Sequence, residues 1–183
     1  MTRPQVIEAL VEIISAIQLD HPLRIGIDGV DCSGKTMLAD ELVQPLKDEG
    51  KEVIRSSIDG FHNPREVRYR QGKGSPIGYF EDSFDLESVV EHVLRPLGLE
   101  GSRKYKTKVF DYRTDSIVDQ GFLIASNSST LLFEGVFLHR PELLNYWDFT
   151  IFVDTDFDVT IQRAFLRDRE YFGDLINTET KYR

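Results

Sequence analysis

The hydrophobic positions in the first third of the chain change period several times. Isoleucine, leucine and valine recur at helical spacing over residues 3–19, which predicts an amphipathic helix. A short apolar run at 23–28 predicts a strand, residues 37–50 predict a helix closed by Gly50, and residues 52–59 predict a second strand. This order forms a βαβ unit, so we expect a parallel sheet covered by helices.

The periodicity is lost in the middle of the chain. Residues 60–84 are rich in glycine, proline and charge, and such a long irregular stretch is usually functional or mobile. Asp85 offers an N-cap for a helix over residues 86–98. Residues 104–112 and 116–125 predict two antiparallel strands, which would form an inserted hairpin.

Two further apolar runs and a last helix complete the pattern. Residues 130–136 and 149–155 are apolar nearly throughout, as expected of central parallel strands, and residues 158–172 predict a helix. No repeat, low-complexity tract or domain linker interrupts the 183 residues. We therefore expect residues 1–183 to form a single α/β domain with an inserted β-hairpin.

The charge balance restricts the classes of partner. Lys plus Arg number 22 against 31 Asp plus Glu, giving a net charge of −9, which argues against a nucleic-acid partner. Residues 65–74 and 102–109 are nevertheless locally basic. These two basic islands are either solvated surface or a means of collecting an anionic substrate.

The compartment is suggested by cysteine content and by the N-terminus. Cys32 is the only cysteine, which excludes an internal disulfide framework and is compatible with a reducing compartment. The N-terminal residues lack the plan of a signal peptide, and no apolar run approaches the ~18 residues that span a bilayer. We expect a cytoplasmic protein with no membrane partner.

The most specific motif is the glycine loop that follows the first strand. It matches G-x-x-x-x-G-K-[ST] without a mismatch, and its predicted phosphate-binding residues are Gly29, Val30, Asp31, Cys32, Ser33, Gly34, Lys35 and Thr36. Backbone N–H groups and the helix dipole would hold phosphate, Lys35 would reach the β- and γ-phosphates, and the Thr36 hydroxyl would bind Mg²⁺. Because a carboxylate repels triphosphate, we expect Asp31 to point toward the acceptor side or a basic partner.

Among the classes of phosphate-loop protein, a small-molecule kinase fits best. A guanine-nucleotide switch would need an Asn-Lys-x-Asp-like base reader late in the chain, and none is found. A kinase needs a carboxylate at the carboxyl end of the second strand, where it can orient or deprotonate a hydroxyl. Asp59 ends that predicted strand.

Six segments, taken together, resemble the uridine kinase/phosphoribulokinase family of P-loop kinases. They are IDGVDCSGKT, SSIDGFHNPR, FEDSFD, KVFDYRTDS, LLFEGVFLHRPEL and WDFTIFVDTDFDVTIQRAFLRD, and they cover about residues 24–170 in the family's order. The resemblance implies a parallel sheet with the phosphate loop at its centre. It also implies ATP as phosphoryl donor and a hydroxyl of a nucleoside or similar alcohol as acceptor.

The resemblance also implies catalytic and metal-binding roles. Asp59 would be the general base and a Mg²⁺ neighbour, and Glu134 would lie near the metal; as alternatives, the two are a turn aspartate and a surface carboxylate. Arg163, Arg167 and Arg169 would belong to a lid, about residues 163–180, that closes over the transferring phosphoryl group, or else be solvated helix residues.

The acceptor-binding residues follow less directly. His62 comes three residues after the predicted base and would contact the acceptor alcohol, unless it is structural. Uridine–cytidine kinases carry a hairpin pattern P-V-Y-D-F-x-x-H-S, and here Phe110 and Asp115 replace its tyrosine and histidine, within a hairpin of about residues 104–124. Ungapped counting places Tyr79 where the family has a ribose-binding aspartate.

The sequence thus predicts ATP- and Mg²⁺-dependent phosphoryl transfer to a nucleoside, with uridine or cytidine giving the 5′-monophosphate. Two alternatives stay open. One is a kinase for another small alcohol or a phosphorylated sugar, because the hairpin residues differ and the basic islands flank the acceptor side. The other is a non-catalytic nucleotide-binding regulator. A homo-oligomer is also left open.

Overall fold

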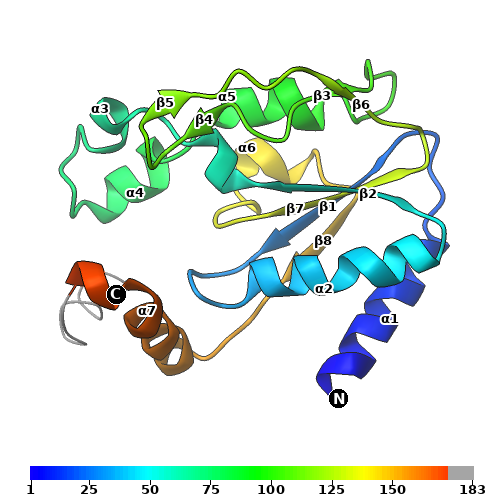
Figure 1. Cartoon of the computed structure of the whole chain (residues 1–183), viewed down its shortest axis with the longest axis horizontal. Coiled ribbons are helices and arrows are strands. Elements are labelled where there is room, and N and C mark those ends of the chain that lie inside the picture. The colour runs from blue at the N-terminus through cyan, green and yellow to red at the C-terminus, as the bar shows by residue number, and fades with distance from the viewer. Residues whose placement is uncertain (173–183) are drawn as a thin grey trace.

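The computed structural model describes residues 1–172, with side chains through residue 166. Its centre is a parallel sheet of β1 (Leu23–Asp28), β2 (Glu52–Ser57), β7 (Ser129–Glu134) and β8 (Phe149–Phe152), in the order β2-β7-β1-β8. Figure 1 shows helices on both sides of this sheet. The predicted α/β class with a parallel sheet is confirmed.

Two helices cover one face of the sheet. These are α1 (Arg3–Ala16) and α2 (Lys35–Asp48), which lie together below the sheet in Figure 1. Their apolar side chains meet those of β1 in a buried cluster that includes Ile14, Ile25 and Leu42. The amphipathic first helix therefore packs as its periodicity predicts, although it ends at Ala16 rather than at residue 19.

The other face carries a second core. It is covered by α5 (Leu86–Val89), a following π-helical turn (Val90–Leu94) and α6 (Pro141–Leu144). Asp85 caps α5 as expected, because its side chain accepts a hydrogen bond from the Ser88 N–H. Trp147 and Phe133 lie in this core with ring centroids 5.6 Å apart.

Two predicted strands differ from the observed ones. The strand predicted over residues 52–59 ends at Ser57, because the chain turns into a short 3₁₀ helix, η1 (Ile58–Phe61). The run 149–155 was expected to be central, but among the described residues β8 pairs only with β1 and lies at the sheet edge. Its side chains accordingly alternate between half-buried and exposed, whereas β7 is buried throughout.

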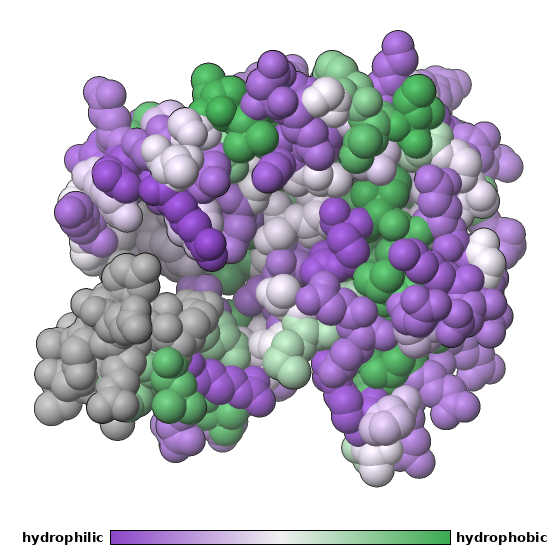
Figure 2. All heavy atoms as spheres, viewed as in Figure 1, coloured by the Kyte–Doolittle hydropathy of each residue, from purple (hydrophilic) through white to green (hydrophobic). Residues whose placement is uncertain are grey.

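The irregular middle segment contains two short helices, α3 (Arg65–Arg68) and α4 (Pro76–Asp82). The inserted hairpin is present as two short antiparallel ladders. These pair β3 (Lys104–Tyr105) with β6 (Leu123–Ile124), and β4 (Phe110–Asp111) with β5 (Ser116–Ile117). Hydrophobic side chains gather on the surface over β6 in Figure 2, where Phe122, Leu123 and Ile124 are exposed.

The register of the sheet determines where polar groups meet. Glu134, the last residue of β7, is level with Ile27 of β1 and with Ser57 of β2. The carboxyl ends of the parallel strands lie at the same end of the sheet. This end therefore carries the phosphate loop after β1, the η1 turn after β2 and the end of β7. The last described helix, α7 (Phe157–Phe172), lies at this end of the molecule in Figure 1.

Candidate functional site

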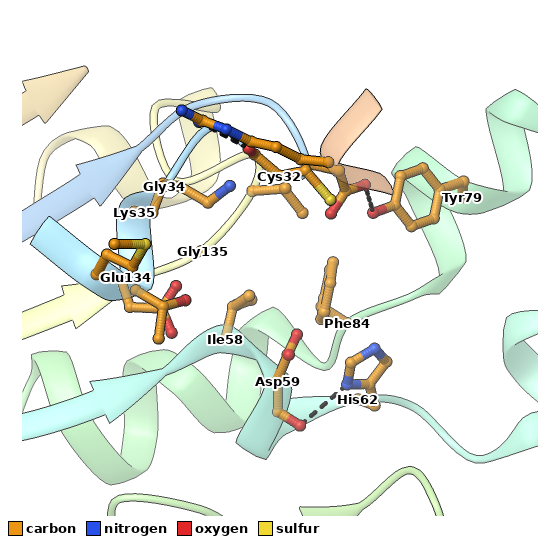
Figure 3. Close-up of a pocket in the computed structure, with 15 residues that line it drawn as sticks. Cys32, Gly34, Lys35, Ile58, Asp59, His62, Tyr79, Phe84, Glu134 and Gly135 are labelled. Carbon is orange, nitrogen blue, oxygen red and sulfur yellow. Dashed lines mark hydrogen bonds between the residues drawn. The ribbon is translucent and has the colours of Figure 1, made fainter. Parts of the chain in front are cut away.

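A cavity of about 600 Å³ lies at the carboxyl ends of the strands. Its walls come from the phosphate loop, η1, α4, the end of β7 and α7 (Figure 3). The lining residues are Asp31, Cys32, Gly34, Lys35, Thr36, Met37, Ile58, Asp59, His62, Tyr79, Phe84, Glu134, Gly135, Val136 and Arg163. Most of the predicted site residues are therefore brought together.

The backbone of the phosphate loop has a positive φ at several residues. Gly34, the N-cap of α2, has a φ of 103°, and Cys32 is left-handed at 59°. The Ser33 carbonyl accepts hydrogen bonds from the Thr155 hydroxyl at 3.0 Å and from the Arg163 guanidinium at 3.2 Å. The loop is thus fastened to the chain that follows β8, while its N–H groups remain at the start of α2.

Lys35 is buried beside carboxylates. Its Nζ donates a hydrogen bond to the Val30 carbonyl at 2.7 Å, and the side chain lies at the cavity wall (Figure 3). Burial lowers the pKa of Lys35, while the nearby charges of Asp31 and Glu134 oppose that shift. A triphosphate would replace the Val30 carbonyl with a stronger, charged partner.

The sequence reasoning missed Asp28, the buried last residue of β1. Its carboxylate accepts a hydrogen bond from the Gly29 N–H at 2.7 Å and another from the His139 N–H at 2.8 Å. It therefore ties the start of the phosphate loop to the segment after β7. The sequence does contain a signal for this role: an aspartate ends an apolar strand directly before a glycine loop.

Asp59 and Glu134 face the cavity from neighbouring elements. Asp59 lies in η1 and is exposed, whereas Glu134 is 7% exposed at the end of β7 (Figure 3). Among the described residues, neither carboxylate takes part in a hydrogen bond or an ion pair. Both remain available to a ligand.

Magnesium fits this part of the cavity. No group of three or more His, Cys, Asp or Glu side chains within the described part of the chain could enclose a metal by itself. Mg²⁺ that travels with a nucleotide needs only one or two protein oxygen ligands besides phosphates and water. The Thr36 hydroxyl and the Glu134 and Asp59 carboxylates, which all line the cavity, supply oxygen atoms of that kind.

His62 is held between aromatic rings on the wall opposite the phosphate loop. Its ring centroid lies 4.6 Å from that of Phe84 and 4.7 Å from that of Tyr112. Its Nδ1 lies 3.0 Å from the Asp59 carbonyl oxygen, and burial lowers the pKa of the ring. The arrangement favours a neutral imidazole that donates from Nδ1.

Tyr79 joins α4 to the phosphate loop. Its hydroxyl donates a hydrogen bond to the Asp31 carboxylate at 2.7 Å, marked by a dashed line in Figure 3. The ring also meets Phe137 edge-on, with centroids 5.3 Å apart. Asp31 therefore points to the side of α4, and its direction relative to a bound triphosphate stays a prediction.

The two predicted hairpin contacts lie elsewhere. Neither Phe110 nor Asp115 is among the described residues that line the cavity. Phe110 is buried in β4, and Asp115 accepts hydrogen bonds from the Arg65 N–H at 2.8 Å and the Arg68 guanidinium at 3.1 Å. Phe110 thus packs inside the protein and Asp115 holds the α3 segment. Their direct contact with an alcohol stays a prediction.

Of the three arginines predicted to belong to a lid, Arg163 lies at the cavity. It lines the wall and donates to the carbonyls of Cys32, at 3.3 Å, and Ser33. The side chains of Arg167 and Arg169, and most of the predicted lid region, lie outside the part of the chain that the structure describes. Their roles stay predictions.

Comparison with known proteins identifies relatives over most of the chain. The model of the Phosphoribulokinase / Uridine kinase family matches residues 24–179. The chain is 30% identical over 149 residues to "Uridine-cytidine kinase B" of Dictyostelium discoideum, which covers 81% of this chain and 59% of that protein. It is also 30% identical over 151 residues to "Uridine kinase" of Geobacillus sp. (strain WCH70), covering 80% and 67%.

A solved structure shares the fold. It is described as that of a possible uridine kinase from Bacillus stearothermophilus, and it is 29% identical with a TM-score of 0.75. The match covers 93% of this chain and 91% of that one. In residues 1–172 of the present structure, no helix is long and apolar enough to cross a membrane.

Proposed function

Because this chain belongs to the phosphoribulokinase/uridine kinase family, we propose that it transfers the γ-phosphoryl group of ATP to a hydroxyl of a nucleoside. Uridine and cytidine are the first candidates, giving the 5′-monophosphates, and residues 1–183 act as a single kinase domain. One observation carries the proposal: the phosphate loop and the available carboxylate of Asp59 face each other across one cavity.

On the donor side, the loop residues hold the triphosphate. The N–H groups at the start of α2 bind phosphate oxygens, and the Lys35 ammonium exchanges the Val30 carbonyl for the β- and γ-phosphates. Arg163, with Arg167 and Arg169 from the same helix, contributes positive charge toward the transferring group. Bound Mg²⁺, held by Thr36, Glu134 and Asp59 together with phosphate oxygens, would neutralise part of the phosphate charge.

On the acceptor side, Asp59 orients the alcohol and receives its proton. The carboxylate is exposed to the cavity and its backbone is fixed by two local contacts. The Asp59 N–H donates to the Ser57 hydroxyl at 3.2 Å, and the Asp59 carbonyl lies 3.0 Å from Nδ1 of His62. A base held on a short rigid turn is suited to a reaction whose catalysis is mostly positioning.

A second acceptor class, another small alcohol, is favoured by one observation. The hairpin positions that carry tyrosine and histidine in the uridine–cytidine kinase pattern are Phe110 and Asp115 here, and neither lines the cavity. A pocket that has lost polar donors also loses most of the discrimination that those donors supplied. The reaction type is unchanged by this alternative.

The test is acceptor-dependent release of ADP from ATP and Mg²⁺. The acceptors compared are uridine, cytidine, other nucleosides, pantothenate and simple sugars. Stimulation by uridine or cytidine supports the nucleoside proposal, and stimulation only by another alcohol supports the second class. Binding of ATP without stimulation by any acceptor in the panel contradicts the proposed activity and favours a nucleotide-binding regulator.

A further inference from the structure

Arg140 lies beside the cavity rather than in its described lining, and it bonds to α4, which forms one of the cavity walls. It is the N-cap of α6, and its side chain is only 8% exposed. Its Nη1 donates a hydrogen bond to the Phe80 carbonyl of α4 at 2.9 Å, and its Cζ lies 4.3 Å from the centroid of the Phe80 ring. Arg140 therefore fastens α4 to the segment that follows β7.

The other two nitrogens of this guanidinium are held by Glu142. Nε and Nη2 donate to its two carboxylate oxygens at 2.9 Å and 2.8 Å. These hydrogen bonds lower the pKa of Glu142 to about 2, so the partner of Arg140 stays ionised near neutral pH. Because the guanidinium is planar, this attachment at two points directs Nη1 at one fixed position, which the Phe80 carbonyl occupies.

The backbone near Arg140 is strained at the place where α4 docks. Phe137 has a φ of 62°, in the left-handed region that a bulky residue rarely adopts. Its ring meets the rings of Tyr79 and Phe80 edge-on, with centroids 5.3 Å and 5.1 Å from its own. The Arg140 N–H donates to the Phe137 carbonyl at 3.3 Å. Such a backbone persists only where its surroundings impose it, and here the Phe137 ring packs on α4.

These contacts join two walls of the cavity. On one side, α4 carries Tyr79 into the lining (Figure 3). On the other side, Glu134 lines the cavity at the end of β7, and the chain continues from there to Arg140. A change at the contact between Arg140 and Phe80 would therefore alter the separation of α4 from the end of β7.

We propose that Arg140 is a positioning residue for the proposed reaction: it holds α4 at the separation from Glu134 that binding of the acceptor alcohol requires. Arg140 acts through α4 and does not itself contact the alcohol. This inference rests on the proposed function, because it concerns the geometry of the same site. Arg140→Met removes the hydrogen bonds of the guanidinium and keeps an unbranched side chain, so α4 should separate from the rest of the protein more often.

Arg24 offers a matched control at the other end of the sheet. Its Nε and Nη2 donate to the Asp148 carboxylate at 2.9 Å and 2.8 Å, and its Nη1 donates to the Leu94 carbonyl at 3.1 Å. Its side chain is 11% exposed, and it lies near the start of β1, whereas the cavity lies at the carboxyl ends of the strands. Arg24→Met therefore removes a similar set of interactions without altering the attachment of α4.

The first measurement is hydrogen–deuterium exchange of the α4 amides, residues 76–82, without ligands. We expect exchange about tenfold to a hundredfold faster in Arg140→Met, on the order expected for the loss of a hydrogen bond from a charged group. Exchange of α4 in Arg24→Met should match that of the unaltered protein. If Arg140→Met does not fold, Arg140→Lys takes its place with the same expected direction, because lysine keeps the charge but cannot form the planar fork.

The second measurement is steady-state kinetics with uridine and ATP as the probes. In Arg140→Met, the KM for uridine should rise about tenfold, because the wall that α4 forms is displaced. The KM for ATP should change by less than about twofold, because β1 and α2 hold the phosphate loop from its two ends. Arg24→Met should lower stability and leave both KM values as they are in the unaltered protein.

The outcomes separate this inference from the proposed function. Unchanged exchange of α4 in the Arg140 variant contradicts the inference. So does a KM for uridine that stays the same in that variant, or that rises equally in Arg24→Met. Exchange needs no turnover, so an unaltered protein that does not phosphorylate uridine contradicts the proposed activity toward uridine alone, and the exchange of α4 then decides the inference.

Discussion

Gly135 and Ile58 approach each other so closely that a side chain at residue 135 has no room. A Cβ atom on Gly135 would lie 2.3 Å from Cγ2 of Ile58 and 2.6 Å from its Cβ. Gly135 follows Glu134 at the end of β7, and Ile58 precedes Asp59 in η1. The spacing between the proposed metal ligand and the proposed base is therefore set by this contact.

The Gly135→Ala substitution should displace η1 and the carboxylate that it carries. A misplacement on the order of 1 Å can cost a hundredfold in rate, so we expect kcat to fall about tenfold to a hundredfold with little change in ATP affinity. Steady-state kinetics and calorimetry give the two quantities. Gly121→Ala is the matched control, because no described heavy atom lies within 4 Å of a Cβ there. Equal activity in the two variants would refute the spacing argument.

Replacing Asp28 by Asn should loosen the phosphate loop. The carboxylate accepts from two buried N–H groups, those of Gly29 and His139, and an amide side chain can accept with only one of its ends. We expect a loss of about 1–3 kcal/mol in the free energy of unfolding, and weaker ATP binding. Chemical denaturation measures the first quantity, and the exposed substitution Asp119→Asn serves as control. Native stability and ATP affinity in Asp28→Asn would show that the carboxylate does not fix the loop.

Glu52 should make folding stability depend on pH in the acid range. The hydroxyls of Ser126 and Ser129 donate to its carboxylate at 2.7 Å each and lower the pKa of Glu52. A depressed folded-state pKa adds stability above the unfolded-state pKa, and that stability is lost as pH falls through the folded-state pKa. The unaltered protein should therefore exceed Glu52→Gln in unfolding free energy at pH 7, with the difference shrinking below about pH 4. A difference that is constant with pH would contradict this assignment.

The phosphate loop was predictable because its chemistry is local. Eight consecutive residues between a strand and a helix specify its backbone, and Lys35 reaches its own loop. The edge position of β8 was not predictable, because strand order depends on pairing between distant segments rather than on the apolar run itself.

The acceptor side depends on contacts between distant residues, so the sequence predicted less of it. Tyr79 and Asp31 are separated by 48 positions, and nothing in either local pattern indicates that they meet. Phe110 and Asp115 were assigned by resemblance; in the structure Phe110 is buried and Asp115 accepts a hydrogen bond from Arg68. Tertiary packing thus decides which polar groups reach the cavity.

The most direct test of the account is the turnover of Asp59→Asn with the acceptor that gives the fastest ADP release. The asparagine keeps the size of the side chain but cannot take the proton of the alcohol, so kcat should fall by about a hundredfold or more. ATP affinity should fall much less than kcat, because the phosphate loop holds the triphosphate and Asp59 approaches the site from η1. Unchanged turnover in Asp59→Asn would contradict the central claim that this carboxylate is the base.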